Sequence, residues 1–329
     1  MKKILILIIS AAILLSSCSS GTEYAASVGK NKISVSEFTF YLNNVKSQME
    51  GTELSSDEDW QTNEIEGKKA IELAREKALE TAVENVAYIE VGKAVGVKLS
   101  QEDKKNIAAN KKKFIAQIGS EEKYKEYLKT QGIDDKFIQM LCESMFYSSK
   151  LTEKIKEEAP VTQEEIHSYF EENKEDLNAQ YRHAKHILIL TKNMTTGEEF
   201  SEEDKEAARL KAEDILKRAK AGEDFDALAA EYSEDPGLKT KPDGYVFGDG
   251  EMVKEFQDGT DALQVGEIGL VKSSFGYHII LRLPLEENDV KDKIEELIIS
   301  DKLNEKMKTW EEENNISVNV QNDVIAQIN

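Results

Sequence analysis

The pattern of apolar residues changes at Pro160, and this change constrains the fold more than any other feature of the sequence. Before it, apolar side chains recur every three or four residues, as in the long stretch 68–95, which predicts amphipathic helices. After it, residues 181–190 alternate and are rich in branched side chains, which predicts a strand. A chain of 329 residues is long enough for about two domains. The sequence therefore predicts a helical part followed by a mixed α and β part.

Short local signals place the first elements of the helical part. Residues 26–34 predict a hairpin, because apolar residues flank the turn-forming Gly-Lys-Asn. Ser34 with Glu37 forms a capping box, which predicts a helix as far as about Met49. The acidic, Ser/Thr-rich stretch 51–66 predicts a mobile loop.

The block behind Pro160 predicts a small α+β unit of about a hundred residues. After the strand at 181–190, Ser201 with Asp204 caps a helix that ends at Gly222, and a second short helix follows. The segment 251–263 predicts another helix, and residues 267–283 predict two strands joined by a tight turn.

The N-terminus predicts export from the cytoplasm. Lys2 and Lys3 precede an apolar run, residues 4–15, which ends in Ser-Ser-Cys18. This is the pattern of a signal peptide, and the run is too short to span a bilayer core of ~30 Å. The ending resembles the lipobox of bacterial lipoproteins, which implies cleavage before Cys18 and attachment of lipid to its sulfur. The alternative is an ordinary signal peptide with an incidental cysteine.

The formal net charge of −21 argues against a nucleic-acid partner. Binding to nucleic acid depends on Lys and Arg side chains that meet phosphates. We therefore expect no nucleic acid among the partners.

Two of the four histidines, His183 and His186, stand three apart in "RHAKHILIL" (182–190). They could be metal ligands, catalytic groups or packed rings. In a strand, alternate side chains share a face, so His186 points with Leu188 and Leu190.

Several motifs behind Pro160 resemble a parvulin-type peptidyl-prolyl isomerase domain. They are "HAKHILIL", "EYSEDPG", "DGYVFGDGEMVKEF", "VGEIG" and "SSFGYHIILRL", in this order and spacing over residues 181–284. The segment "ASVGKNKISVSEFTFYL" resembles the opening of the N-terminal chaperone domain of PrsA-type and SurA-type foldases, and "ISVNV" (316–320) resembles the end of PrsA-type lipoproteins. The whole chain is thus similar to PrsA-type foldase lipoproteins.

The resemblance implies an α+β fold with two parts. The N- and C-terminal segments form one all-helical chaperone lobe, and the parvulin domain is inserted as a four-stranded antiparallel sheet covered by helices. The implied boundaries are 1–17 for the signal peptide, 18–178 for the chaperone domain, 179–285 for the parvulin domain and 286–329 for a helix and strand that return to the lobe.

The resemblance also implies the site. His186 and His278 are the parvulin histidine pair, and Asp235 is the acid that faces them. Met252 and Phe256 line a slot for the proline ring, on one face of a short helix. His183 lies outside the motif, and we expect it to be an exposed polar residue. Zinc needs three or four protein ligands with an open coordination geometry, whereas the implied site offers only the two histidines and one carboxylate, so we expect no metal.

In one loop the sequence departs from the parvulin pattern. Many parvulins read Gly-Gly-Asp-Leu-Gly where this chain has Pro242-Asp243-Gly244-Tyr245. The usual apolar leucine is absent, so Tyr245 or Phe247 must close the slot, or the slot is shallower.

We therefore predict a lipid-anchored foldase on the outer face of the bacterial cell membrane. It would bind unfolded exported polypeptides and isomerise their X–Pro bonds without a cofactor or metal, through the catalytic groups His186, Asp235 and His278. Two alternatives stay open: a binding-only chaperone with a weak parvulin domain, and a solute- or metal-binding lipoprotein. The sequence leaves both the monomer and a homodimer open.

Overall fold

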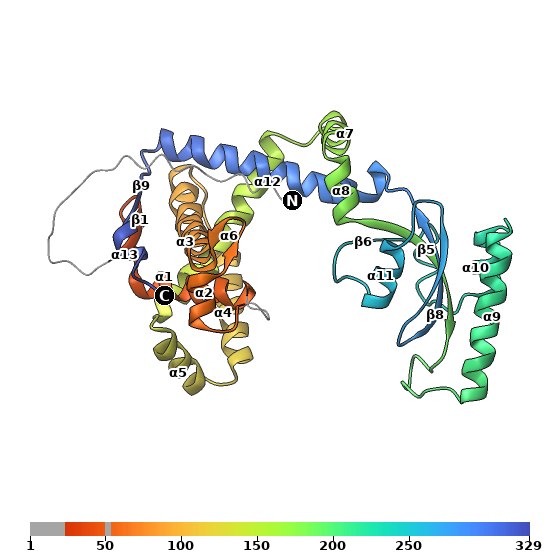
Figure 1. The fold of residues 1–329 in the computed structure, drawn as a ribbon. Coiled ribbons are helices and arrows are strands. Elements are labelled where there is room, and N and C mark those ends of the chain that lie inside the picture. The colour runs from red at the N-terminus through yellow and green to blue at the C-terminus, as the bar shows by residue number, and fades with distance from the viewer. Residues whose placement is uncertain (1–23, 50–53) are drawn as a thin grey trace. The chain divides into compact units, whose positions relative to one another are not determined.

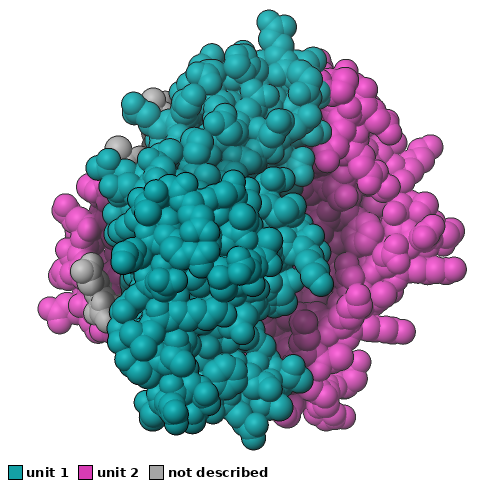
Figure 2. Space-filling view, turned by 90° about the vertical axis from the view of Figure 1, so that its right-hand side faces the viewer, with its two compact units in different colours: residues 1, 161–298 teal, residues 2–160, 299–329 magenta. Residues whose placement is uncertain are grey.

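The computed structural model describes residues 24–49 and 54–329 (Figure 1). The described chain divides into two compact units, coloured separately in Figure 2. The inserted unit comprises Val161–Ile298, and the terminal lobe comprises the described residues up to Pro160 together with Ile299–Asn329. This division confirms the prediction that both ends of the chain build one lobe around an inserted domain.

The terminal lobe is mostly helical. Its helices are α1 (Val35–Met49), α2 (Asp57–Thr62), α3 (Ala70–Ala94), α4 (Gln101–Ile118), α5 (Glu121–Gln131), α6 (Asp135–Glu158) and the second part of α12 (Glu287–Glu313). The central α3 packs against α1 and α6. Gly92 of α3 lies against the ring of Tyr147, where any side chain would overlap the ring, so a glycine allows this close approach.

A small sheet joins the two ends of the chain within the terminal lobe. Strand β1 (Tyr24–Val28) pairs with β2 (Asn31–Ser34) on one side and with β9 (Val318–Val320) on the other, both antiparallel. After β9 the short α13 (Asn322–Ile325) follows, and Arg75 of α3 donates a hydrogen bond of 2.8 Å to the carbonyl oxygen of Ile328. The hairpin at 26–34 and the C-terminal strand are therefore as predicted, and they add a sheet to the helical lobe.

The predicted mobile loop at 51–66 is wrong for its described part. Residues 57–62 form α2, which Ser56 and Asp59 begin with a capping box, and a short hairpin of β3 (Glu64–Ile65) and β4 (Lys68–Lys69) follows. Trp60 is buried in this segment. The sequence analysis missed the helix and the hairpin because the stretch is acidic. The capping box of α2 uses Ser and Asp residues, which also occur often in loops.

The inserted unit is built around one antiparallel sheet in the order β6-β5-β8-β7. Its strands are β5 (Arg182–Leu190), β6 (Tyr245–Phe247), β7 (Ile268–Lys272) and β8 (Gly276–Leu283). Helices α9 (Glu202–Lys220) and α10 (Phe225–Tyr232) cover one face, and α11 (Lys254–Asp261) covers the other (Figure 1). This is the predicted four-stranded antiparallel sheet with covering helices.

Strand alternation divides the core of this unit into two clusters. Ile187, Ile189 and Ile279 pack beneath α9 and α10, whereas Ala184 and Ile280 pack with Phe247 and Phe256 on the α11 face. Neighbouring residues of a strand point to opposite faces, so the two clusters occupy the two sides of the sheet.

The inserted unit is wider than the predicted domain 179–285. Helices α7 (Gln163–Glu172) and α8 (Lys174–Gln180) pack with Leu285 and the first part of α12 in a third cluster, made of Ile166, Phe170, Leu177, Leu285, Val290, Ile294 and Ile298. Tyr181 and Val246 of the sheet region also pack against it. The cluster ties both flanks of the insertion to the sheet.

We expect the inserted unit to fold alone, and limited proteolysis to leave a fragment near 161–298. A shorter fragment, 179–285, should melt about 5–10 °C lower, because it exposes Tyr181, Val246 and Leu285. Circular dichroism melts of the two purified fragments measure the difference. Equal melting temperatures would show that the third cluster adds nothing to the domain.

Candidate active site

The pairing of β5 with β8 brings His186 and His278 together. In this register His186 lies opposite Ile280 and Leu188 lies opposite His278, so both histidines project from the α11 face. Their rings stack at an interplanar angle of 20°, and the two Nδ1 atoms are 3.1 Å apart. The predicted histidine pair is thus assembled across two central strands.

Asp235 reaches this pair because the chain runs beside β5 after α10. The Glu234 N–H donates to the Leu188 carbonyl oxygen at 2.8 Å, and the Leu188 N–H donates to Ser233 Oγ at 3.1 Å. These bonds place the next residue, Asp235, with its Oδ2 at 3.3 Å from His186 Nε2.

A continuous chain of hydrogen bonds links these groups. The Asp235 carboxylate can only accept, so His186 Nε2 carries a proton and donates to it. The two Nδ1 atoms form the next hydrogen bond at 3.1 Å. His278 Nε2 is bonded to the Ser273 hydroxyl at 2.7 Å, and Ser273 Oγ accepts from the Phe275 N–H at 3.1 Å. Every polar atom of the pair therefore has a partner.

Tyr245 completes the site from the loop that departs from the parvulin pattern. Its hydroxyl donates to Asp235 Oδ2 at 2.6 Å. Gly237 makes this possible, because any side chain at Gly237 would overlap the Tyr245 hydroxyl. Gly244 has a φ of +102°, and a Cβ there would lie 2.6 Å from the Ala184 carbonyl oxygen, so this turn also requires glycine.

An apolar wall lies against the histidines. The Phe256 ring meets His186 edge-on at 5.1 Å and His278 at 5.4 Å between ring centroids, and Phe247 is buried behind it at 5.6 Å. Met252 and Tyr245 are half-buried and pack against the same cluster. Met252 precedes α11 rather than sharing a helix face with Phe256, since the helix begins at Lys254; the predicted helical spacing is wrong, although both side chains join one cluster.

Arg182 fixes the segment that carries this wall. From the first residue of β5 its guanidinium binds Asp249 and Asp261, each at 2.6 Å. Asp249 lies in the turn before α11 and Asp261 is the last residue of α11, so one half-buried cation holds both ends of the segment against the sheet.

His183 is buried rather than exposed, which corrects the expectation from the motif. Its Nε2 donates to the Asp243 carbonyl oxygen at 2.8 Å, and its Nδ1 lies 3.2 Å from the Pro284 carbonyl oxygen and 2.9 Å from Asp289 Oδ2. The strand register places His183 on the central strand β5, opposite Val246 of β6 and Leu283 of β8. His183 anchors the loop that leads into Tyr245.

The surroundings of Asp235, His278 and Tyr245 shift the pKa values of these groups in different directions. Burial raises the pKa of Asp235, but hydrogen bonds from His186, Tyr245 and the Gly237 N–H outweigh it and lower the pKa to about 2. Burial and the neighbouring His186 lower the pKa of His278 to about 4. Burial and the Asp235 carboxylate raise the pKa of Tyr245. At neutral pH the site therefore holds an ionised acid beside a neutral His278 and a protonated tyrosine.

Within residues 24–49 and 54–329, no group of three or more His, Cys, Asp or Glu side chains is placed to hold a metal ion.

One residue and one hydrogen bond of the site escaped the sequence analysis. Ser273 stands five residues before His278 in the quoted motif, and only the turn between β7 and β8 brings its hydroxyl to the ring. Tyr245 was predicted as a wall of the slot, and its hydrogen bond to Asp235 has no signal in the sequence.

The low pKa of His278 makes the fold sensitive to acid. Its pKa is about 4 in the fold against 6.5 as the ordinary value, so between these pH values the unfolded chain binds more protons and stability falls as the pH falls. We expect a loss on the order of 2 kcal/mol between pH 7 and pH 4.5, measured by urea unfolding. Asp235 acts in a lower window, since its contribution is present above 3.8 and is lost as the pH falls through about 2.

The control for this prediction is His278→Asn, which should flatten the dependence between pH 4.5 and pH 7, while the exposed His167→Gln should keep it. An unchanged slope in His278→Asn would show that another group causes the acid sensitivity.

Comparisons with known proteins agree with this geometry. Residues 169–282 match the family described as the PPIC-type PPIase domain, and residues 1–151 match the SurA-like N-terminal domain. The chain is 30% identical over 315 residues to the foldase protein PrsA of Caldanaerobacter subterraneus, covering 92% of this chain and 89% of that protein.

Two further proteins are similar to the chain. PrsA of Clostridium tetani is 29% identical, with coverage of 88% of this chain and 84% of that protein. The crystal structure of PrsA from Bacillus subtilis is 21% identical and covers 80% of this chain and 88% of that one at a TM-score of 0.29, which supports no structural argument.

The PPIC-type match falls on the unit that carries the histidine pair, and the relative from Caldanaerobacter is similar over nearly the whole chain. The chain belongs to the PrsA foldase family, and it is a parvulin-type peptidyl-prolyl cis-trans isomerase with a SurA-like N-terminal domain.

Proposed function

We propose that the protein is a membrane-anchored, extracytoplasmic foldase. In this proposal the terminal lobe binds unfolded exported polypeptides, and the inserted unit isomerises their X–Pro bonds with His186, Asp235 and His278 as its central groups. The observation that carries the proposal is the hydrogen-bond chain from Tyr245 through Asp235 and both histidines to Ser273, set against an apolar wall.

Isomerisation of an X–Pro bond requires few protein side chains. An X–Pro bond is held planar by resonance behind a barrier of ~18–20 kcal/mol, and catalysis requires that the twisted amide bind better than either planar state. The planar amide carries more negative charge on its carbonyl oxygen than the twisted one does. The ionised Asp235, facing that oxygen, would destabilise the planar form relative to the transition state.

Some of the remaining side chains would contact the proline ring, and the others would hold those groups in place. Met252 and Tyr245 are half-buried, so their exposed atoms are available to a proline ring. Phe256 is 3% exposed and Phe247 is 1% exposed. We assign Phe256 to the floor of the slot and Phe247 to its backing. His186 and His278 hold Asp235 and the floor in place, since their ring nitrogens are already engaged with one another and with Asp235 and Ser273.

The anchoring part of the proposal rests on the N-terminal sequence. Cys18 and the apolar run before it lie outside the described residues. In residues 24–49 and 54–329, none of the helices has the length and apolar character needed to cross a bilayer. A diacylglycerol on Cys18 would supply two acyl chains, which are enough for stable anchoring to the outer face of the cell membrane.

We expect Asp235→Ala to reduce kcat/KM for prolyl isomerisation at least about 10-fold, because it removes the one fixed charge at the amide. Tyr245→Phe keeps the ring and removes the hydrogen bond to Asp235, so its loss should be smaller, about 2- to 5-fold. Phe256→Ala should raise KM by opening the slot. A protease-coupled assay with a proline-containing peptide measures all three.

Circular dichroism of each variant checks that the fold is retained. Tyr232→Phe is the matched control, because Tyr232 accepts a hydrogen bond from Arg218 within the same unit but lies on the opposite face of the sheet. Wild-type turnover in Asp235→Ala would refute the role assigned to this carboxylate, and a wild-type rate equal to the uncatalysed rate would favour the binding-only chaperone.

For the anchor, we expect Cys18→Ala to release the protein from the membrane fraction or to leave an unprocessed precursor. Cell fractionation and labelling with a fatty acid measure the two effects. Cys142→Ala replaces the other cysteine of the chain and should change neither. Fractionation that is the same for Cys18→Ala and wild type, without label on the wild type, would exclude lipid attachment at Cys18.

A further inference from the structure

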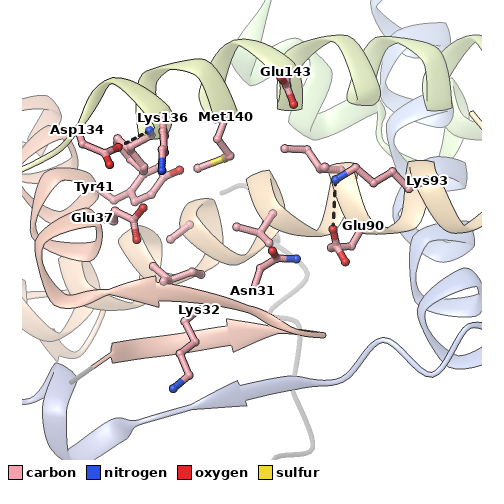
Figure 3. A pocket seen from close by; sticks show the side chains of 15 residues that line it. Asn31, Lys32, Glu37, Tyr41, Glu90, Lys93, Asp134, Lys136, Met140 and Glu143 are labelled. Carbon is pink, nitrogen blue, oxygen red and sulfur yellow. Dashed lines mark hydrogen bonds and ion pairs between the residues drawn. The ribbon is translucent and has the colours of Figure 1, made fainter. Parts of the chain in front are cut away.

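The terminal lobe holds a cavity of about 340 Å³ that is separate from the isomerase site. Figure 3 shows its lining, which comes from β2, α1, α3 and α6. Its walls mix charged and polar side chains with apolar ones, and the apolar ones include Ile33, Val86, Ile89, Phe137 and Met140. The volume is at the small end of the range for ligand sites, so it suits one large side chain better than a cofactor.

Tyr41 places an unused hydrogen-bonding group in this cavity. The residue is only 5% exposed, and its hydroxyl has no hydrogen-bond partner among the described residues. The ring is fixed by edge-on contacts with Phe40 at 5.9 Å and Phe137 at 5.6 Å, so the hydroxyl cannot easily turn toward another partner. A buried polar group without a partner is rare and costly, and a bound ligand would relieve that cost.

The hydroxyl is available as a donor. Burial, and then the charge of Glu37, raise the pKa of Tyr41, so the group keeps its proton at all physiological pH values. An acceptor such as a carbonyl oxygen is therefore the complementary ligand group.

The cavity also adjoins the edge of a sheet. β2 pairs with β1 on one side and, among the described strands, with none on the other. Asn31, Lys32 and Ile33 of β2 line the cavity. Figure 3 labels Asn31 and Lys32 on this strand, across from α6. An edge strand offers backbone N–H and C=O groups to an extended chain, which is one of the recurring modes of peptide recognition.

The rim of the cavity carries both signs of charge. Glu90 and Lys93 form an ion pair of 3.6 Å, and Glu143 and Lys136 lie on α6. A mixed rim does not select a strongly charged ligand of either sign, whereas it tolerates the neutral backbone of many different peptides.

We propose that this cavity is a binding site for an extended segment of an unfolded polypeptide. The segment lies along the free edge of β2, one large apolar side chain enters the cavity, and a backbone carbonyl accepts a hydrogen bond from Tyr41. The inference rests on the proposed foldase function and assigns client recognition in the terminal lobe to one location.

The probe is a short fluorescein-labelled peptide of Gly, Ser and Thr residues with one central Phe. It contains no proline, so the isomerase site has no substrate, and fluorescence anisotropy measures its affinity for the purified full chain. We expect Tyr41→Phe to weaken binding about 2- to 10-fold, as for one lost hydrogen bond. Val86→Trp should weaken it further by filling the cavity, and a peptide with Ala in place of Phe should bind more weakly to wild type.

A thermal melt without peptide gives a second measurement, in which Tyr41→Phe should improve stability although it weakens binding. Because Tyr41→Phe removes a buried hydroxyl that has no partner, the variant should melt about 2–4 °C higher than wild type while it binds the peptide less well. A role of Tyr41 in packing alone would leave both quantities unchanged. Tyr147→Phe, a buried tyrosine of α6 that does not line the cavity, is the matched control and should bind as wild type does.

The possible outcomes test the cavity and the proposed foldase function separately. If wild type binds the Phe peptide and Tyr41→Phe and Val86→Trp bind it equally well, the cavity is not the site, and the foldase proposal stands. If wild type binds no peptide at all, both the cavity and client binding by the terminal lobe are refuted.

Discussion

The antiparallel pairing of β5 with β8 is the constraint on which the active site depends. Its register runs from His183 opposite Leu283 to Leu190 opposite Gly276. A shift of one residue would turn His186 to the α9 face and Ile187 to the α11 face, which would place an imidazole in the apolar cluster and a branched side chain in the site. The buried isoleucines on the α9 side therefore enforce the register that the histidines need.

Within that frame, the polar groups of the site restrain one another. Tyr245 and His186 hold Asp235, His278 holds His186, and Ser273 holds His278. Such a chain resists rearrangement, because rotating any one ring would leave a buried neighbour without a partner. The loop that departs from the usual parvulin pattern fits this scheme: His183 fixes the Asp243 carbonyl, and Tyr245 then supplies a hydroxyl to the acid.

The terminal lobe depends on a contact between the two ends of the chain. β1 pairs with β9, so that Ala26 lies opposite Val320. Closing so long a loop costs entropy, although the cost grows only slowly with length. The inserted unit has its own cores, and once it is folded it shortens the flexible part of that loop. This organisation leaves the other edge of the small sheet, β2, free beside the cavity.

The sequence by itself determined the elements and their class. Capping pairs such as Ser34 with Glu37, period-3.6 stripes and the alternation at 181–190 are local signals, and they predicted the longer helices, the hairpin at 26–34 and the central strand. Family motifs selected His186, His278 and Asp235, which the fold does bring together. Only the tertiary structure decided which further groups meet them. The burial of His183, the hydrogen bond of Tyr245 to Asp235, the contact of Ser273 with His278 and the unpartnered hydroxyl of Tyr41 all depend on residues from separate elements. Their hydrogen bonds are set by strand register and helix packing, which act over distances along the chain that local patterns do not encode.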